Sequence, residues 1–163
     1  MNQEKLGWKE KYSALIVLII GGFYLIIQTI GLISSQSKRF TSEGSKVSFN
    51  LTELREDLKI YIVVVLAILG GILLLYRKRL GWIIGLPVLI WYTILAANGI
   101  VMSVALRTFD ISFLLVIIGF TILALAVAFL FTKSARAKYK VGKHLYLPTF
   151  LVLLAIVAIY FWL

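Results

Sequence analysis

Cysteine is absent from the 163-residue sequence, which excludes disulfide bonds and thiol chemistry. A single histidine and seven acidic residues form no group with the spacing of metal or haem ligands. Charged residues make up 15% of the chain, against about 25% in an average soluble domain. These deficits exclude a disulfide-stapled secreted module and an ordinary soluble domain, and they predict neither a metal nor a cofactor.

Long apolar runs take the place of the missing charge. Hydrophobic residues account for 61% of the chain, and the mean hydropathy is +1.00. A helix needs about 20 mostly apolar residues to cross roughly 30 Å of hydrocarbon. Five stretches meet this requirement, at about 12–35, 58–76, 80–106, 111–132 and 145–163. The sequence therefore predicts an all-α membrane protein, with residues 1–163 forming a single membrane domain built as a bundle of five transmembrane helices.

Lysine and arginine are unevenly distributed between the two ends of these predicted spans. Short loops that are rich in Lys and Arg stay in the cytoplasm. The N-terminal segment and the 2–3 and 4–5 connections hold 11 of the 17 basic residues, namely Lys5, Lys9, Lys11, Arg77, Lys78, Arg79, Lys133, Arg136, Lys138, Lys140 and Lys143. We therefore expect a cytoplasmic N-terminus, an external C-terminus and a multi-pass location in a bacterial cytoplasmic (inner) membrane. The alternative is a eukaryotic organelle, where Asn50-Leu-Thr52 would be a glycosylation acceptor.

The net charge of +10 needs no nucleic-acid partner. Most of it lies in short loops on one side of the predicted bundle, where it sets the orientation and attracts anionic lipid headgroups. Membrane lipids are therefore the expected partners of this charge.

Residues 35–58 form the longest segment between spans and are expected to lie on the outer side. The sequence Ser42-Glu-Gly-Ser45 has turn chemistry, and it separates 38–41 from 46–49, of which the second alternates polar and apolar residues. This pattern predicts a small hairpin-like outer loop, followed by a helix that starts near Leu51. The loop is either a lid or docking element, or an ordinary ordered connection.

Small residues recur along one face of spans 1 and 3, and such residues let membrane helices approach closely. We therefore expect a compact bundle with spans 1 and 3 at its centre. The glycines expected in the helix contacts are Gly21, Gly31, Gly71, Gly81, Gly85 and Gly99.

Two side-chain amides, Gln28 and Asn98, lie inside apolar runs. An amide without a partner is costly in hydrocarbon, so both need hydrogen-bonding neighbours. The candidate intramembrane site consists of the two amides and the polar or aromatic residues near them, namely Tyr24, Gln28, Trp91, Tyr92, Asn98 and Ser103. Two interpretations stay open: hydrogen bonds that join helices, or an uncharged polar ligand pocket between spans 1 and 3.

Familiar catalytic motifs are missing from the sequence. It has no HExxH, P-loop or GxGxxG motif, no Cys nucleophile and no pair of intramembrane carboxylates. We therefore expect no catalytic residues, and a non-catalytic accessory or assembly subunit of a larger membrane complex. Its partner within the membrane would be another protein or a second copy. The alternatives are a small channel, carrier or lipid- or small-molecule-binding protein that uses the pocket, and, more remotely, an intramembrane enzyme of unfamiliar type.

Overall fold

The computed structural model describes the backbone of residues 7–42 and 51–162, and the side chains of residues 7–31 and 58–161. Within these residues every regular element is helical, as predicted. The elements are α1 (Trp8–Ser42), α2 (Leu51–Leu75), α3 (Arg79–Ala105), α4 (Ile111–Leu130), α5 (Lys133–Lys138), the 3-10 helix η1 (Lys143–Leu145) and α6 (Tyr146–Trp162). Five helices, α1 to α4 and α6, are long and apolar enough to cross a membrane, which is the architecture of a multispanning membrane protein.

The connection between the first two spans is shorter than expected. Residues 38–41, predicted as the first strand of a hairpin, continue α1 as helix, so that prediction is wrong. A continuing helix satisfies its own backbone groups, whereas an isolated hairpin is marginal in water. The second predicted strand, 46–49, lies outside the described residues. Helix α2 begins at Leu51, which confirms the predicted start.

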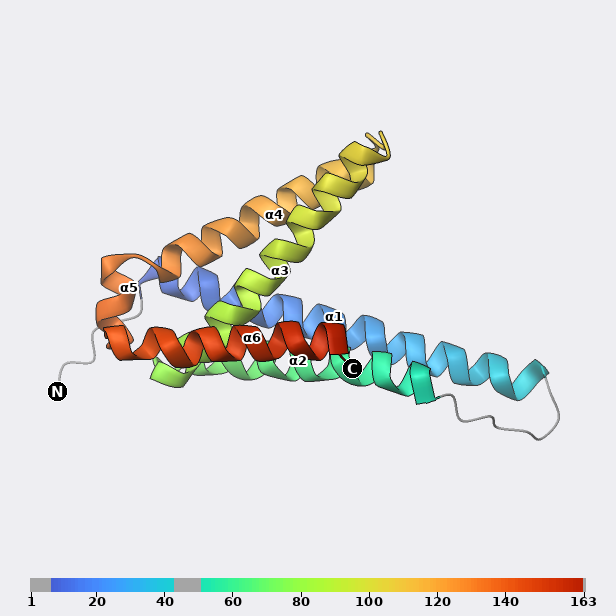
Figure 1. Ribbon diagram of the computed structural model, residues 1–163, viewed down its shortest axis with the longest axis horizontal. Helices are drawn as coiled ribbons and strands as arrows, with labels where there is room; N and C mark the ends of the chain where they lie inside the picture. The colour runs from blue at the N-terminus through green and yellow to red at the C-terminus, as the bar shows by residue number, and fades with distance from the viewer. Residues whose placement is uncertain (1–6, 43–50, 163) are drawn as a thin grey trace.

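Helix α3 is the central helix of the bundle and packs against α2, α4 and α6 (Figure 1). In its most apolar stretch 50% of the residues are buried, against 17% in α1, α4 and α6. The expectation that span 1 shares the centre is wrong, because α1 packs mainly on α2 and α4 and meets α3 over a short stretch. The small-residue stripe of α1 faces α2, where a Cβ at Gly21 would lie 3.1 Å from that of Ala67.

Glycines bring α2 and α3 close together. A Cβ at Gly70 would lie 2.9 Å from the Gly85 Cα, and a Cβ at Gly81 would collide with the backbone of Leu73 and Leu74. These contacts fix the direction in which α3 leaves the turn that follows α2. Gly70 was not among the glycines predicted to lie in helix contacts. The adjacent Gly71 was among them, and it faces α1, where a Cβ would lie 2.6 Å from Leu18 Cγ.

Gly99 and Gly31, the two remaining glycines predicted to lie in helix contacts, have different surroundings. A Cβ at Gly99 would lie 3.3 Å from Val116 Cγ1, so Gly99 lies in the contact between α3 and α4. Gly31 is exposed, and no described atom lies within 4 Å of the position of its Cβ. Close packing of α1 is therefore seen at Gly21 and not at Gly31.

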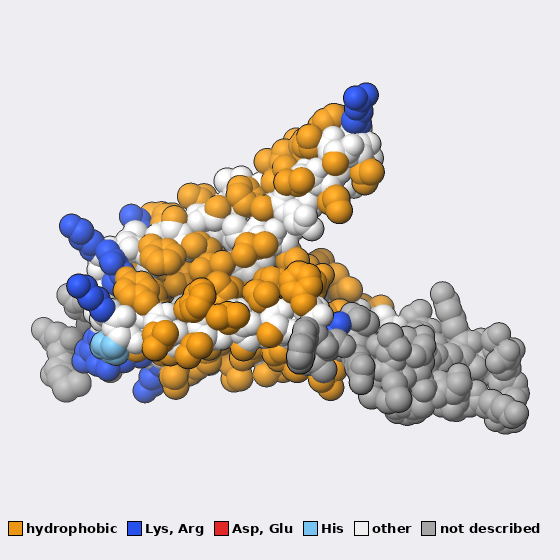
Figure 2. Space-filling model, viewed as in Figure 1, with side chains coloured by type: hydrophobic (Ala, Val, Ile, Leu, Met, Phe, Trp, Pro, Cys, Tyr) orange, Lys and Arg blue, Asp and Glu red, His pale blue; other side chains and the backbone are white. Residues whose placement is uncertain are grey.

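Helices α3 and α4 form a hairpin that leans away from α1, α2 and α6 toward its tip (Figure 1). We call its diverging part, residues 94–118, the α3–α4 arm. The space-filling view shows an open notch between this arm and the rest of the molecule, with hydrophobic side chains on both sides (Figure 2). The arm is closed at its tip by Asp110, whose side chain accepts a hydrogen bond from the Phe113 amide at 3.1 Å and so caps α4.

Three helices end in the same way, with a basic residue in the left-handed conformation that glycine usually occupies. These residues are Arg77, Arg107 and Lys140, with φ of 55°, 54° and 51°. The amide that follows each one bonds to the carbonyl five residues earlier (Lys78 to Leu73, Thr108 to Ser103, Val141 to Arg136). A cation suits a helix C-terminus, where carbonyl oxygens carry partial negative charge.

Candidate functional site

The structure brings together some of the predicted intramembrane residues. The rings of Tyr24 on α1 and Tyr92 on α3 pack with their centroids 5.2 Å apart. Trp91 packs instead on Tyr160 of α6, with centroids 4.9 Å apart. These two ring contacts hold the middle of α3 between α1 and α6.

The two amides occupy different environments. Gln28 is half-buried on α1 and has an interaction partner. Asn98 is exposed on the α3–α4 arm, and none of the hydrogen bonds between described residues involves it. Ser103, half-buried further along α3, contributes its backbone carbonyl to the turn that closes the arm. The structure therefore joins Tyr24 to Tyr92 but does not join Gln28 to Asn98.

A second polar cluster, which sequence reasoning missed, lies where α1 begins and α5 passes. Lys and Arg side chains gather at this end of the molecule (Figure 2). We call it the basic end: residues 7–13, 74–82 and 130–146. Its central group is Glu10, whose side chain is only 2% exposed and whose Oε1 lies 3.3 Å from the Lys138 Nζ. Ser134 Oγ donates to the same oxygen at 3.4 Å.

The second carboxylate oxygen of Glu10, Oε2, is also closely packed. A Cβ at Gly7 would collide with Glu10 Oε2, and this oxygen is buried without a hydrogen-bond partner among the described residues. A buried charge is costly unless it is paired, so Glu10 depends on α5 for its compensation. The sequence signal was present but weak: Glu10 is one of two acids in an otherwise basic N-terminal segment.

Side chains at the basic end also donate hydrogen bonds to backbone carbonyls of other helices. Ser13 Oγ donates to Ala126 O at 2.9 Å, which joins α1 to α4. Trp82 Nε1 donates to Leu130 O at 3.4 Å, at the last residue of α4. The last four carbonyls of a helix have no partner within it, so Trp82 satisfies a group at Leu130 that would otherwise be orphaned.

Tyr139 makes a bond of the same kind to α2. Its hydroxyl donates to Leu74 O at 3.0 Å, and its side chain is fully buried. Burial raises the pKa of the Tyr139 phenol well above its ordinary value, the charge of Glu10 raises it further, and Arg77 opposes the shift. The hydroxyl is therefore protonated at neutral pH and acts as a donor.

Comparisons with models of known families, with curated proteins and with solved structures find no match to this chain. Its function has to be argued from the two polar regions described above. At the basic end, a carboxylate, an ammonium, hydroxyls and an indole tie α1, α2, α3, α4 and α5 together. On the α3–α4 arm, one amide is left exposed among apolar side chains.

Proposed function

We propose that this protein is a non-catalytic, multispanning accessory or assembly subunit of a membrane complex, and that it holds a partner's transmembrane helix against the α3–α4 arm. One observation carries the proposal: Asn98 is exposed inside a membrane-spanning helix, with no hydrogen bond to any described residue. Lipid tails offer no donor or acceptor, so this amide gains a partner when another helix packs there. Such interhelical bonds contribute about 0.6–2 kcal/mol each.

The face that carries Asn98 continues a face that is already used for packing. Asn98 follows Trp91 by two helical turns, about 10 Å along the axis, and therefore lies on the same side of α3. Trp91 is 5% exposed and packs on Tyr160 of α6. One turn beyond Asn98, Met102 is 56% exposed. Helix α6 thus covers the first part of this face, and the second part is open.

Large exposed apolar side chains occur both on the arm and on α1. On the arm these include Ile94, Val101 and Val104, and on the outward-facing part of α1 they include Phe23, Ile26 and Ile30, each at least 49% exposed. Lipid can cover apolar side chains as well as protein can, so they do not by themselves distinguish the two. The amide makes the distinction, because a helix can satisfy it and an acyl chain cannot.

The alternative of a channel, carrier or ligand-binding protein relied on a pocket between spans 1 and 3. Tyr24 and Tyr92, two of its expected lining residues, pack against each other at that level. This contact favours the structural interpretation of the two tyrosines, so we retain the subunit as the proposal.

Photo-crosslinking in the native membrane tests the proposal. A benzophenone amino acid at position 102 is expected to give one discrete protein adduct, and the same probe at position 147 of α6, away from the arm, is expected to give none. Asn98→Leu should weaken the adduct by about three- to thirtyfold, which corresponds to the loss of one interhelical bond, whereas the matched control Val101→Leu, an exposed apolar change on the same helix, should retain it.

The outcomes of this experiment separate the partners. An adduct with a different chain supports a hetero-complex, and an adduct of doubled mass identifies a second copy as the partner. Crosslinking to lipid alone, or an adduct that persists unchanged in Asn98→Leu, would overturn the proposal.

A further inference from the structure

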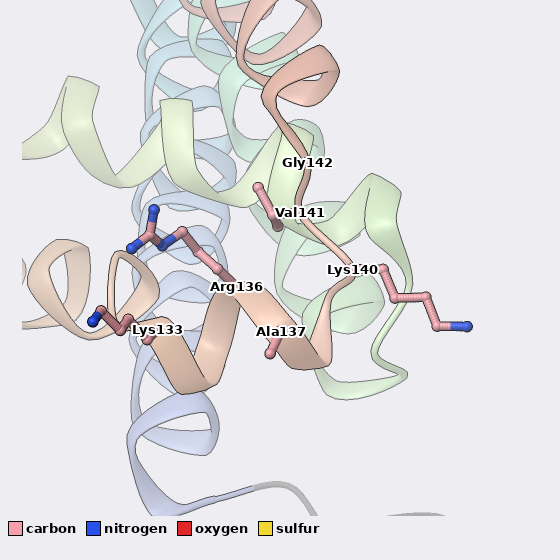
Figure 3. A pocket seen from close by; sticks show the side chains of 6 residues that line it. All are labelled: Lys133, Arg136, Ala137, Lys140, Val141 and Gly142. Atoms are coloured by element: carbon pink, nitrogen blue, oxygen red, sulfur yellow. The ribbon is translucent and has the colours of Figure 1, made fainter.

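Helix α5 and the chain that follows it form a shallow basic depression of about 400 Å³. Six residues line it, namely Lys133, Arg136, Ala137, Lys140, Val141 and Gly142 (Figure 3). The side chains of Lys133 and Arg136 extend to the same side of α5, whereas that of Lys140 extends away from them (Figure 3). The depression therefore presents two cations side by side and has no acidic residue in its lining.

The guanidinium of Arg136 is only partly satisfied. Its Nη1 donates to the Tyr146 hydroxyl at 3.3 Å. Its Nε is buried and has no hydrogen-bond partner among the described residues. A guanidinium has five N–H donors and no acceptor, and it binds planar or tetrahedral oxyanions through two parallel bonds. The bond to Tyr146 fixes one edge of the group and leaves the Nε edge without an acceptor.

No acid within residues 7–31 and 58–161 forms an ion pair with Lys133 or Arg136. Among the described residues, the carboxylate nearest to α5 is Glu10, and it pairs with Lys138 on that helix. The charge of the depression is therefore uncompensated within the described part of the chain. The exposed ammonium of Lys133 and the N–H donors of Arg136 that do not bond to Tyr146 form the kind of donor set that a phosphate group requires.

The surroundings indicate what carries the phosphate. Tyr146 packs edge-to-face on Trp82, with ring centroids 5.7 Å apart, and Phe131 also packs edge-to-face on Trp82, with centroids 6.3 Å apart. Along α6, Leu147 and Phe150 are 66% and 57% exposed. Aromatic rings of this kind lie at the boundary between headgroups and acyl chains. Through the bond between Arg136 and Tyr146, the depression thus adjoins the start of α6, a helix with large exposed apolar side chains.

We propose that Lys133 and Arg136 bind the phosphate of an anionic phospholipid at this depression, with Tyr146 orienting the guanidinium. The site is separate from the α3–α4 arm, so its test does not depend on the proposed subunit function. It also differs from a general attraction of the basic end to anionic lipid, because it assigns binding to two named residues out of many.

Native mass spectrometry of the full chain in detergent, titrated with phosphatidylglycerol or phosphatidylcholine, tests this site. The wild type is expected to bind phosphatidylglycerol at least tenfold more tightly. Arg136→Gln and Lys133→Gln should each weaken phosphatidylglycerol binding about tenfold, the loss expected for one charge-assisted contact. The control Lys143→Gln removes an exposed cation outside the depression and should change binding less than twofold.

Further variants keep the test decisive. Arg136→Lys retains the charge but loses the paired donors, so it should bind with intermediate affinity. It also serves in place of Arg136→Gln if the loss of the Tyr146 bond impairs folding. Equal binding by wild type, Arg136→Gln and Lys133→Gln, or an equal loss in Lys143→Gln, would overturn the site. Displacement of the lipid by low-millimolar inorganic phosphate would overturn the assignment to a lipid and indicate a free phosphate ligand.

Discussion

The basic end and the α3–α4 arm are held by different kinds of interaction. At the basic end, the Glu10–Lys138 pair and side-chain bonds to backbone carbonyls join helices that are distant in sequence. Toward the tip of the arm, α3 contacts α4 alone, and the exposed Asn98 makes no such bond within the described residues. Polar contacts therefore fix helix positions at one end, and their lack at the other leaves helix faces open for a partner. The following predictions test this contrast.

The largest effect is expected from Lys138→Met. It leaves the Glu10 carboxylate, 2% exposed, without its cation, and the loss of one member of a buried pair costs about 3–5 kcal/mol. The free energy of unfolding in detergent, from chemical denaturation, provides the measurement. Lys140→Met, at an exposed lysine near the same helix, should change stability by less than about 0.5 kcal/mol.

A double variant sharpens this test. Glu10→Gln combined with Lys138→Met should be less destabilising than the sum of the single changes, because no unpaired charge remains. Additive losses would show that the pair does not contribute through its charges.

The next largest effect is expected at the contact between α2 and α3. In Gly81→Ala the new methyl group would meet the backbone of Leu73 and Leu74, which cannot rotate away as a side chain can. We expect a loss of about 2–3 kcal/mol in the same unfolding assay. Gly119→Ala is the matched control, since no described atom lies within 4 Å of that Cβ, and it should leave stability equal or slightly higher. Equal effects of the two changes would contradict the close approach.

A smaller loss is expected for Tyr139→Phe, which removes the hydroxyl that donates to Leu74 O. The carbonyl keeps its bond from the Arg77 amide, so the expected cost is about 1–1.5 kcal/mol. Thermal unfolding in detergent detects a difference of this size. A similar loss in Tyr76→Phe, at an exposed tyrosine, would show that the effect does not come from this bond.

The same residue predicts a pH dependence. Because the pKa of Tyr139 is raised in the folded protein above its unfolded value of 10.0, the unfolded chain loses this proton first as pH rises. The stabilisation is fully present below about pH 10 and decreases above it, with a slope of up to about 1.4 kcal/mol per pH unit. Unfolding free energies measured from pH 8 to 11 should decline less steeply in Tyr139→Phe. Identical slopes would contradict the burial of the phenol.

The smallest effect is expected at the tip of the arm, where Arg107 has a φ of 54°. Arg107→Gly relieves the left-handed conformation and should stabilise the chain by about 1 kcal/mol. The midpoint of thermal unfolding is the measurement. A decrease would indicate that the arginine side chain contributes more to this turn than its backbone strain removes.

The helices could be predicted from the sequence, but which helices pack against each other could not. Long runs without charge identify all five spans, because length and hydropathy alone decide whether a helix can cross a bilayer. A stripe of small residues indicates that a helix packs closely, but not on which helix. Gly21 therefore signalled a contact of span 1, while the structure was needed to show that the contact is with α2.

The polar contacts at the basic end escaped prediction for a related reason. Glu10 meets Ser134 across 124 residues of sequence, and the meeting depends on the short helix α5. No local pattern connects an acid before the first span to a lysine after the fourth. Asn98, by contrast, stood out in the sequence, because an amide within an apolar run is conspicuous wherever it lies.

The contact between α1 and α5 also sets an order of events in biosynthesis. A ribosome makes Glu10 long before it makes α5, and the spans in between enter the membrane during that interval. Until α5 exists, the Glu10 carboxylate lacks Lys138 and Ser134, and the Leu74 carbonyl lacks Tyr139. The first four spans are therefore an unfinished unit, and the segment between α4 and α6 completes it.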